Sequence, residues 1–225
     1  MPTPTALPLA SSSADPQHKR ERRKEARPGE LLDAALALFV EKGFAATKAE
    51  EVAARAGVSK GTLFLYFQSK EDLFKAVIRK NITHLFPAWN EEFMQFTGSS
   101  ADMLRYAMNS WWANIGNTPA SGIPKLVMSE AQNFPEIAAF YQEEVILPGH
   151  ALIRKILARG IERGEFRSLD LDHAVHTIVA PMIFLMMWKN SMGCCAANSL
   201  HIEPERFIQL QVDVLLHGIQ SQASL

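Results

Sequence analysis

The sequence predicts an all-α protein with a three-helix N-terminal domain and a larger helical domain behind it, about nine or ten helices in total. Apolar residues recur at i, i+3 or i+4 and i+7 along almost the whole chain, which is the spacing of one helix face. No stretch alternates apolar and polar residues as a half-buried strand would. Ser, Thr, Pro and Gly, which begin or end helices, stand between the periodic stretches.

The composition is that of an ordinary soluble protein, with 48% hydrophobic and 21% charged residues over 225 positions. No apolar run approaches the ~18 residues of a membrane-spanning helix. The first residues lack the basic segment and the apolar segment of a secretion signal. The only cysteines, Cys194 and Cys195, are adjacent, which excludes a disulfide framework and favours a reducing compartment. We therefore expect a cytoplasmic protein with no membrane partner.

Residues 1–27 are expected to form a disordered N-terminal extension, because Pro, Thr, Ser and Ala dominate its first part. Residues 18–27 hold six basic and two acidic side chains. Two interpretations of this basic segment stay open. It is either an arm that follows DNA phosphates or enters the minor groove, or a solvated tail with a frayed helical turn.

The first helix is expected from Pro28 to Gly43, since proline suits the first turn of a helix. Its apolar stripe consists of Leu31, Leu32, Ala35, Leu38 and Phe39. Gly43 ends the helix, and Phe44 is placed to fold back onto it as the hydrophobic partner of the cap. This helix would brace the segment that follows.

Residues 47–67 predict two short helices joined by a tight turn. Thr47 is a good N-cap, and Glu50 three residues later completes a capping box. Gly57 supplies the turn because it adopts a positive φ without strain, and Ser59 caps the second helix. One shared apolar face collects Val52, Ala53, Ala56, Leu63 and Phe67. The pattern is that of a helix-turn-helix.

The remaining chain predicts further helices. A fourth helix begins after its cap at Ser69 and continues to about Phe86, before Pro87. Pro148 and Gly149 should kink a long helix that opens at Pro135. The other expected helices are Trp89–Phe96, Ala101–Gly116, Pro119–Asn133, Leu171–Ser191 with an interruption at Pro181, and Glu203–Ile219.

A family resemblance covers residues 28–78, in the segment L-L-D-A-A-L-A-L-F-V-E-K-G-F-A-A-T and in E-V-A-A-R-A-G-V-S-K-G-T-L-F-L-Y-F-Q-S-K-E-D-L-F. These residues resemble the DNA-binding domain of the TetR/AcrR family of bacterial transcriptional regulators. The resemblance implies a helix-turn-helix domain over 28–75 and a helical effector-binding and dimerisation domain over 76–225. Two residues depart from the pattern: Ala49 is smaller than usual, and Phe64 replaces a frequent tyrosine.

In a helix-turn-helix, the second helix enters the major groove with its N-terminal residues toward the base edges. The motif and the resemblance together predict DNA contacts from Thr47, Lys48, Ser59, Lys60, Gly61, Thr62, Leu65, Tyr66 and Lys70. The alternative is a solvated surface side chain for the lysines and edge packing for Leu65. Charge agrees with the DNA interpretation, because residues 1–80 carry 14 Lys or Arg against 10 Asp or Glu, whereas residues 81–225 carry 9 against 14.

One such domain covers one half-site of double-stranded operator DNA, so a homodimer is expected. The resemblance places the interface on the last two helices, with the apolar stripe Val175, Ile178, Val179, Met182, Met186, Phe207, Leu210 and Val214. The alternative is that these residues belong to the core of a single chain.

The middle of the chain is rich in aromatic residues and methionines, which suits a cavity for a small-molecule effector. The predicted ligand-binding residues are His84, Trp89, Phe93, Met108, Asn109, Trp111, Trp112, Met128, Gln132, Phe140 and His176. For any single one of them, plain core packing is the alternative.

Few residues suggest chemistry. His173 and His176 make a weak metal signal, and adjacent cysteines in a loop are a weak redox signal. No P-loop, nucleophile elbow or H-E-x-x-H motif occurs. We expect no enzyme, no cofactor and no metal. The sequence favours a homodimeric repressor that a small apolar or amphipathic molecule releases from DNA. The alternative is a cytosolic small-molecule binding protein whose helix-turn-helix is structural.

Overall fold

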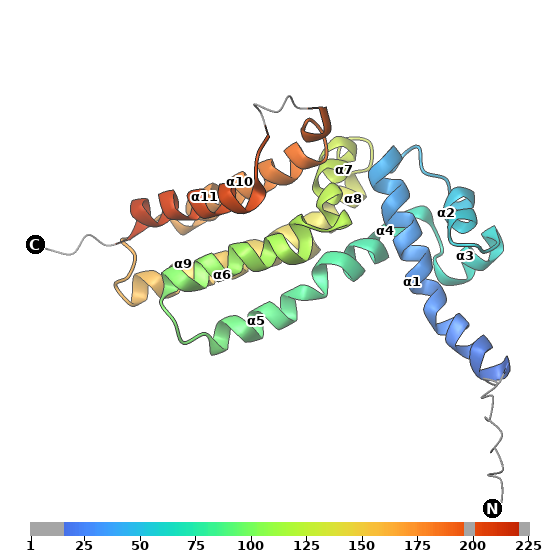
Figure 1. Ribbon diagram of the computed structural model, residues 1–225, viewed down its shortest axis with the longest axis horizontal. Coiled ribbons are helices and arrows are strands. Elements are labelled where there is room, and N and C mark those ends of the chain that lie inside the picture. The colour runs from blue at the N-terminus through green and yellow to red at the C-terminus, as the bar shows by residue number, and fades with distance from the viewer. Residues whose placement is uncertain (1–15, 196–200, 221–225) are drawn as a thin grey trace, which may run out of the picture.

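The computed structural model describes residues 16–195 and 201–220. The regular secondary structure of these residues is helical, apart from one isolated bridge between Phe166 and Gln220. The all-α prediction is therefore confirmed. Figure 1 shows an elongated molecule. The helices α1 to α3 lie at one end, α4 and α5 lead away from them, and α10 and α11 lie toward the other end.

The helices are α1 (Pro16–Lys42), α2 (Ala49–Arg55), α3 (Lys60–Tyr66), α4 (Lys70–Ile78), α5 (Leu85–Gln95), α6 (Ser100–Trp111), α7 (Ile123–Glu130), α8 (Pro135–Tyr141), α9 (Leu147–Glu162), α10 (Leu171–Lys189) and α11 (Pro204–Ile219). Three π-helical segments join some of them: η1 (Arg79–Thr83), η2 (Trp112–Gly116) and η4 (Gln142–Ile146). Two short 3₁₀ segments, η3 (Pro119–Gly122) and η5 (Gly193–Cys195), complete the described elements.

The predicted helix-turn-helix is present as α2 and α3. Gly57 between them has a φ of 66°, and the Ser59 hydroxyl accepts a hydrogen bond from the Thr62 N–H at 3.1 Å. Val52, Ala53 and Leu63 form the buried face between the two helices. The N-cap of α2 differs from the prediction. It is Lys48, whose backbone N–H donates to the Glu51 carboxylate at 3.3 Å, so the cap lies one residue later than Thr47 and Glu50.

The Thr47 side chain instead bonds to the C-terminal end of the first helix from a buried position. Its side chain is 1% exposed, and its hydroxyl lies 2.7 Å from the Gly43 carbonyl and 3.2 Å from that of Leu38. Leu38 lies in the last turns of α1, and Gly43 directly follows the helix. Thr47 therefore stabilises the corner where the chain turns from α1 toward α2.

The first helix begins earlier than predicted. α1 starts at Pro16 and contains Pro28 in its interior, so residues 16–27 continue the helix and are not a disordered extension. Residues 1–15 lie outside the described part of the chain. In Figure 1 the N-terminal part of α1 projects beyond α2 and α3.

The predicted boundaries around two prolines also change. Pro87 lies in the first turn of α5, where a missing N–H removes no helical hydrogen bond, so α5 starts at Leu85 and not at Trp89. The long helix after Pro135 is interrupted by η4 immediately before Pro148. Because Pro148 has no N–H to donate, the ladder changes register there, and the Leu147 N–H bonds to the Gln142 carbonyl.

The two parts of the molecule meet at an aromatic corner. The Phe44 ring lies 5.6 Å from Phe39, 5.4 Å from Phe74 and 4.8 Å from Phe134, measured between ring centroids. Phe39 and Phe74 belong to α1 and α4, whereas Phe134 caps α8. The corner therefore joins the helix-turn-helix unit to the domain behind it.

Thr47→Val tests the buried corner. The substitution keeps the volume but removes the two carbonyl contacts, and we expect it to lower the free energy of unfolding by about 1–3 kcal/mol in urea titrations. Thr83→Val is the matched control. Its hydroxyl makes only a long 3.4 Å contact with the Arg79 carbonyl in an exposed position, so we expect less than about 0.5 kcal/mol. Equal effects of the two substitutions would contradict this role of Thr47.

Candidate DNA-binding surface and ligand cavity

The outer face of α3 is a surface of exposed side chains. Leu65 is 83% exposed, Phe64 is 40% exposed, and Lys60 and Gly61 are exposed beside them. Tyr66 is half-buried at the end of the helix. An exposed leucine of this degree on a short helix has no packing role within the described chain.

Lys60 is held over this surface by its neighbours. Its ammonium lies 2.5 Å from a carboxylate oxygen of Glu50 on α2 and 5.7 Å from the centre of the Phe64 ring. The hydrogen bond from Lys60 lowers the pKa of Glu50 below its ordinary value. Both side chains of the pair are more than half exposed, so a phosphate or base that approaches α3 competes with Glu50 for the ammonium.

Gly61 lies at the first turn of α3 without a structural need for glycine. A Cβ built there would meet only the Ser59 Oγ, at 3.8 Å. The fold itself therefore leaves room for a side chain. The open space at Gly61 is the feature that a close approach of another molecule to the backbone requires.

Two predicted DNA contacts need correction. The Lys70 ammonium is used inside the protein, where it donates to the carbonyls of Phe44 at 2.9 Å and Ala45 at 3.2 Å and lies 4.5 Å from the centre of the Phe44 ring. Thr47 is buried and bonded to α1, as described above. Both residues therefore support the corner instead of presenting a group to DNA. Lys48 remains exposed, and its contact stays a prediction.

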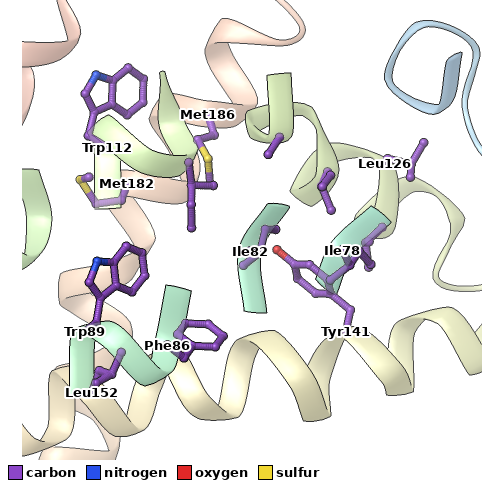
Figure 2. Close-up of a cluster of buried hydrophobic side chains, with 14 of the residues drawn as sticks. Ile78, Ile82, Phe86, Trp89, Trp112, Leu126, Tyr141, Leu152, Met182 and Met186 are labelled. Atoms are coloured by element: carbon purple, nitrogen blue, oxygen red, sulfur yellow. The ribbon is translucent and has the colours of Figure 1, made fainter. Parts of the chain in front are cut away.

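A cavity of about 490 Å³ lies in the larger domain. It is enclosed by η1, by the helices α5 to α10 and by the segments η2 and η4 between them. Figure 2 shows part of the apolar side chains that gather around it, with Ile82, Phe86 and Trp89 on one side and Met182 and Met186 on another. Walls of this kind suit a small, mainly apolar molecule.

Sequence reasoning located part of this cavity. The lining includes the predicted residues Trp89, Phe93, Met108, Trp111, Met128 and His176. The other predicted ligand residues do not line it. His84, Asn109 and Gln132 are exposed to solvent elsewhere. His84 and Gln132 lie in turns, and Asn109 lies on an exposed face of α6. Trp112 and Phe140 are buried in the surrounding core, where Phe140 packs under Arg79 and Lys75.

The lining also includes three polar residues outside the predicted ligand-binding set: Ser110, Tyr141 and His150. The imidazoles of His150 and His176 meet edge to face, with ring centroids 4.8 Å apart. Burial, and in second place the neighbouring His176, lower the pKa of His150. Tyr141, Val145, Gly149 and Ile153 repeat every four residues, a signal that Pro148 and Gly149 obscured. His173 lies instead 2.8 Å from the Asp170 carboxylate, so it and His176 are not brought together.

The predicted dimer stripe divides into two sets. Val175, Ile178, Met182 and Met186 are buried inside the chain, so their prediction as interface residues is corrected to core and cavity wall. Val179 is half-buried and lines the cavity. Leu210 and Val214 on α11 are 64% and 63% exposed, Phe207 is half-buried, and Phe184 on α10 is exposed beside it. Their role between two copies stays a prediction.

The helix α10 is the one helix in the described ranges whose length and apolar composition would allow it to cross a membrane. Its mean hydropathy is 1.3 over an 18-residue window, of which 28% is buried within the chain. A core helix of a soluble protein passes the same test, and α10 packs against α7, α9 and α11.

A helix-turn-helix with an exposed second helix, followed by a helical domain that encloses an apolar cavity, is the architecture of helix-turn-helix transcriptional regulators. Comparison with known families specifies the kind. A model of the bacterial regulatory proteins of the tetR family matches residues 31–77, and a tetracyclin repressor-like C-terminal domain model matches residues 95–191. The chain therefore belongs to the TetR family.

Relatives of known sequence are transcriptional regulators. The HTH-type regulator YdeS of Bacillus subtilis is 28% identical over 174 residues, which cover 76% of this chain and 84% of that protein. The HTH-type repressor KstR2 of Mycobacterium tuberculosis is 30% identical over 148 residues, 65% of this chain and 72% of that protein.

Solved structures share the fold. FadR from Bacillus subtilis in complex with stearoyl-CoA has a TM-score of 0.65 at 20% identity and covers 85% of this chain and 99% of its own. A putative regulator from Saccharomonospora viridis in complex with choline has a TM-score of 0.72 at 20% identity and covers 88% of this chain and all of its own.

The lowered pKa of His150 predicts a pH dependence of stability. Protonation favours the unfolded chain, so stability is lost as the pH falls through the ordinary histidine value of about 6.5. We expect His150→Asn to lose less stability than the unsubstituted protein between pH 7.5 and pH 5.5 in urea unfolding at fixed protein concentration. His173→Asn on the surface is the control, and it should lose as much stability between these pH values as the unsubstituted protein. An unchanged profile in His150→Asn would assign the pH dependence to other groups.

Proposed function

We propose that the protein is a homodimeric transcriptional repressor that a small, mainly apolar or amphipathic molecule releases from its operator. One observation carries this proposal: a single helical segment touches both sites. α4 contributes Leu73 and Phe74 to the core beneath the helix-turn-helix, and η1, which continues it directly, contributes Ile82 to the cavity wall. A molecule in the cavity therefore contacts the same segment that supports the DNA-binding unit.

The DNA step uses the exposed face of α3. Lys60 has the reach to contact a guanine or a phosphate, and Gly61 lets the backbone approach the groove. Leu65 and Tyr66 follow one turn later, where an apolar contact with a thymine methyl and a phosphate contact are available. With few direct donors on this face, DNA shape contributes to specificity.

The dimer step uses α10 and α11. The two helices are held together by a hydrogen bond of 3.0 Å from the Gln211 side chain to the Ile178 carbonyl, and they present Phe184, Phe207, Leu210 and Val214 outward. An apolar face of this kind on a soluble chain calls for a partner surface. A second copy would cover it with the same face, which builds a four-helix bundle and places two DNA-binding units side by side.

The coupling step passes through the π-helical segments η1 and η4. Arg79 of η1 forms an ion pair with Glu144 of η4, and its guanidinium lies 4.9 Å from the centre of the Phe140 ring. Ile82 lies three residues beyond Arg79, and Val145 and Ile146 directly follow Glu144; all three line the cavity. A ligand that separates these segments moves α4, and so favours a spacing of the two DNA-binding units that the operator does not accept.

The relatives include both a repressor and an activator of transcription. KstR2 is named a repressor, whereas FasR of Mycolicibacterium smegmatis is named an activator and is 30% identical over 116 residues, about half of either chain. We favour repression because the match to KstR2 covers more of both chains than the match to FasR. A regulator of this kind acts on the chromosome in the cytoplasm and performs no catalysis.

Binding of the purified protein to the DNA upstream of its own gene tests the proposal. Fluorescence anisotropy should show tight binding to this DNA and at least a hundredfold weaker binding to a shuffled sequence of equal length. Equal, salt-sensitive binding to both, or none, would contradict a specific regulator and favour a small-molecule binding protein with a structural helix-turn-helix.

Lys60→Ala tests the reading surface. We expect it to weaken operator binding by about 1–3 kcal/mol and to relax specificity, because a base contact is lost. The matched control is Lys155→Ala on α9, whose ammonium bonds to Asn90 far from α3 and should leave operator binding unchanged. An equal loss on operator and on shuffled DNA would reassign Lys60 to a phosphate contact.

Leu210→Glu tests the dimer surface. A charge at this 64% exposed apolar position should turn the dimer into a monomer in light scattering at micromolar concentration, because the carboxylate would be desolvated in the interface. Met94→Glu on α5 introduces the same charge at an 80% exposed apolar position outside the proposed face and should leave the dimer intact. A monomeric unsubstituted protein would overturn the proposed assembly.

A further inference from the structure

Tyr141 is a buried tyrosine whose hydroxyl has no partner within the described chain. Tyr141 is 8% exposed, and its hydroxyl forms no hydrogen bond with any described residue. The other two tyrosines do not line the cavity. Tyr106 donates to the Glu92 carboxylate at 2.9 Å on the surface, and Tyr66 lies on α3. Because Tyr141 lines the cavity, a molecule inside the cavity can supply the partner that its hydroxyl lacks.

The position of this hydroxyl places its hydrogen-bond partner inside the cavity. Tyr141 lines the cavity at the end of α8, and Figure 2 shows its oxygen directed toward Ile82, another lining residue. Burial raises the pKa of Tyr141, so the hydroxyl stays protonated and able to donate. Tyr141 therefore offers the cavity a preplaced hydrogen-bond donor on a mainly apolar wall.

The rest of the lining restricts the charge of an occupant. Among the described residues that line the cavity there is no Lys, Arg, Asp or Glu, and the remaining polar groups are Ser110, His150 and His176. His176 is exposed, as are the lining residues Met128 and Ala180, so these positions mark the solvent side of the cavity. A carboxylate or an ammonium group beside Tyr141 would therefore be desolvated without a counter-charge.

We infer that Tyr141 anchors the effector by donating a hydrogen bond to a neutral acceptor, and that the effector class is mainly apolar carbonyl compounds, bound with the carbonyl oxygen at Tyr141. This inference rests on the proposed function, because it specifies the molecule that the cavity takes. Discrimination follows from the same hydroxyl. A hydrocarbon of equal shape leaves the donor unpaired, and a site with a buried donor rejects an analogue that lacks the acceptor.

Binding of three matched probes tests the inference: trans-1-decalone, trans-decalin and trans-decalin-1-carboxylate. Their dissociation constants are measured through the fluorescence of Trp89 and Trp111, which line the cavity. The ratio of the decalone constant to the decalin constant removes the hydrophobic contribution that both probes share. In Tyr141→Phe this ratio should rise by about three- to tenfold, because only the ketone loses a hydrogen bond. The carboxylate should bind the unsubstituted protein more weakly than the ketone.

Tyr106→Phe is the matched control, since it removes a tyrosine hydroxyl outside the cavity and should leave the ratio unchanged. A ratio that is the same in Tyr141→Phe and in the unsubstituted protein overturns the inference, as does tighter binding of the carboxylate than of the ketone. Thermal unfolding separates a structural role. Tyr141→Phe should melt at the same or a higher temperature, and a clear decrease would show that the hydroxyl is bonded within the protein.

Release of labelled operator DNA by the same probes is measured separately. A ratio that depends on Tyr141 without release of operator supports the anchor and contradicts the regulator proposal. Release by decalin and decalone alike, with no dependence on Tyr141, supports the regulator proposal and overturns the anchor.

Discussion

The aromatic corner around Phe44 is the interaction on which both halves of the molecule depend. Its ring is fully buried and contacts phenylalanines from α1, from α4 and from the start of α8, so one side chain belongs to two cores at once. Lys70 covers the ring and at the same time binds the Phe44 carbonyl behind the C-terminal end of α1, where a positive charge is favourable. Because the corner is closely packed, we expect a movement of α4 to change the orientation of the whole helix-turn-helix unit.

The helix α10 shows how one apolar segment serves several surfaces. Met182 and Met186 face the cavity and the core, whereas Phe184, only two residues from each, faces outward beside α11. An amphipathic helix would offer one such face, but α10 is apolar around most of its circumference. The methionines adapt to the shape of the cavity, so ligand contact and core packing need not conflict there.

The sequence predicted the helix-turn-helix well because its caps, its turn glycine and its apolar face are local features with distinct signals. It predicted Thr47 and Lys70 as DNA contacts because nothing local shows that the chain folds back to bury one and to place the carbonyls of Phe44 and Ala45 under the other. The cavity was found only in part for the same reason. Trp112 is of a residue type that is common in cavity walls. Tertiary packing decides whether such a residue lines the cavity or lies in the surrounding core, as Trp112 does. His150 was hidden by the adjacent proline and glycine.

The two π-helical segments η1 and η4 lie against each other at the junction between the DNA-binding unit and the cavity. A π turn holds one residue more than an α turn, so each segment is equivalent to a one-residue insertion into a regular helix. Loss of such a residue would restore the α-helical ladder and turn the side chains of the adjoining helix by about 100° around its axis. In this architecture, a single-residue insertion or deletion in η1 or η4 would therefore change which side chains face the cavity without removing a helix.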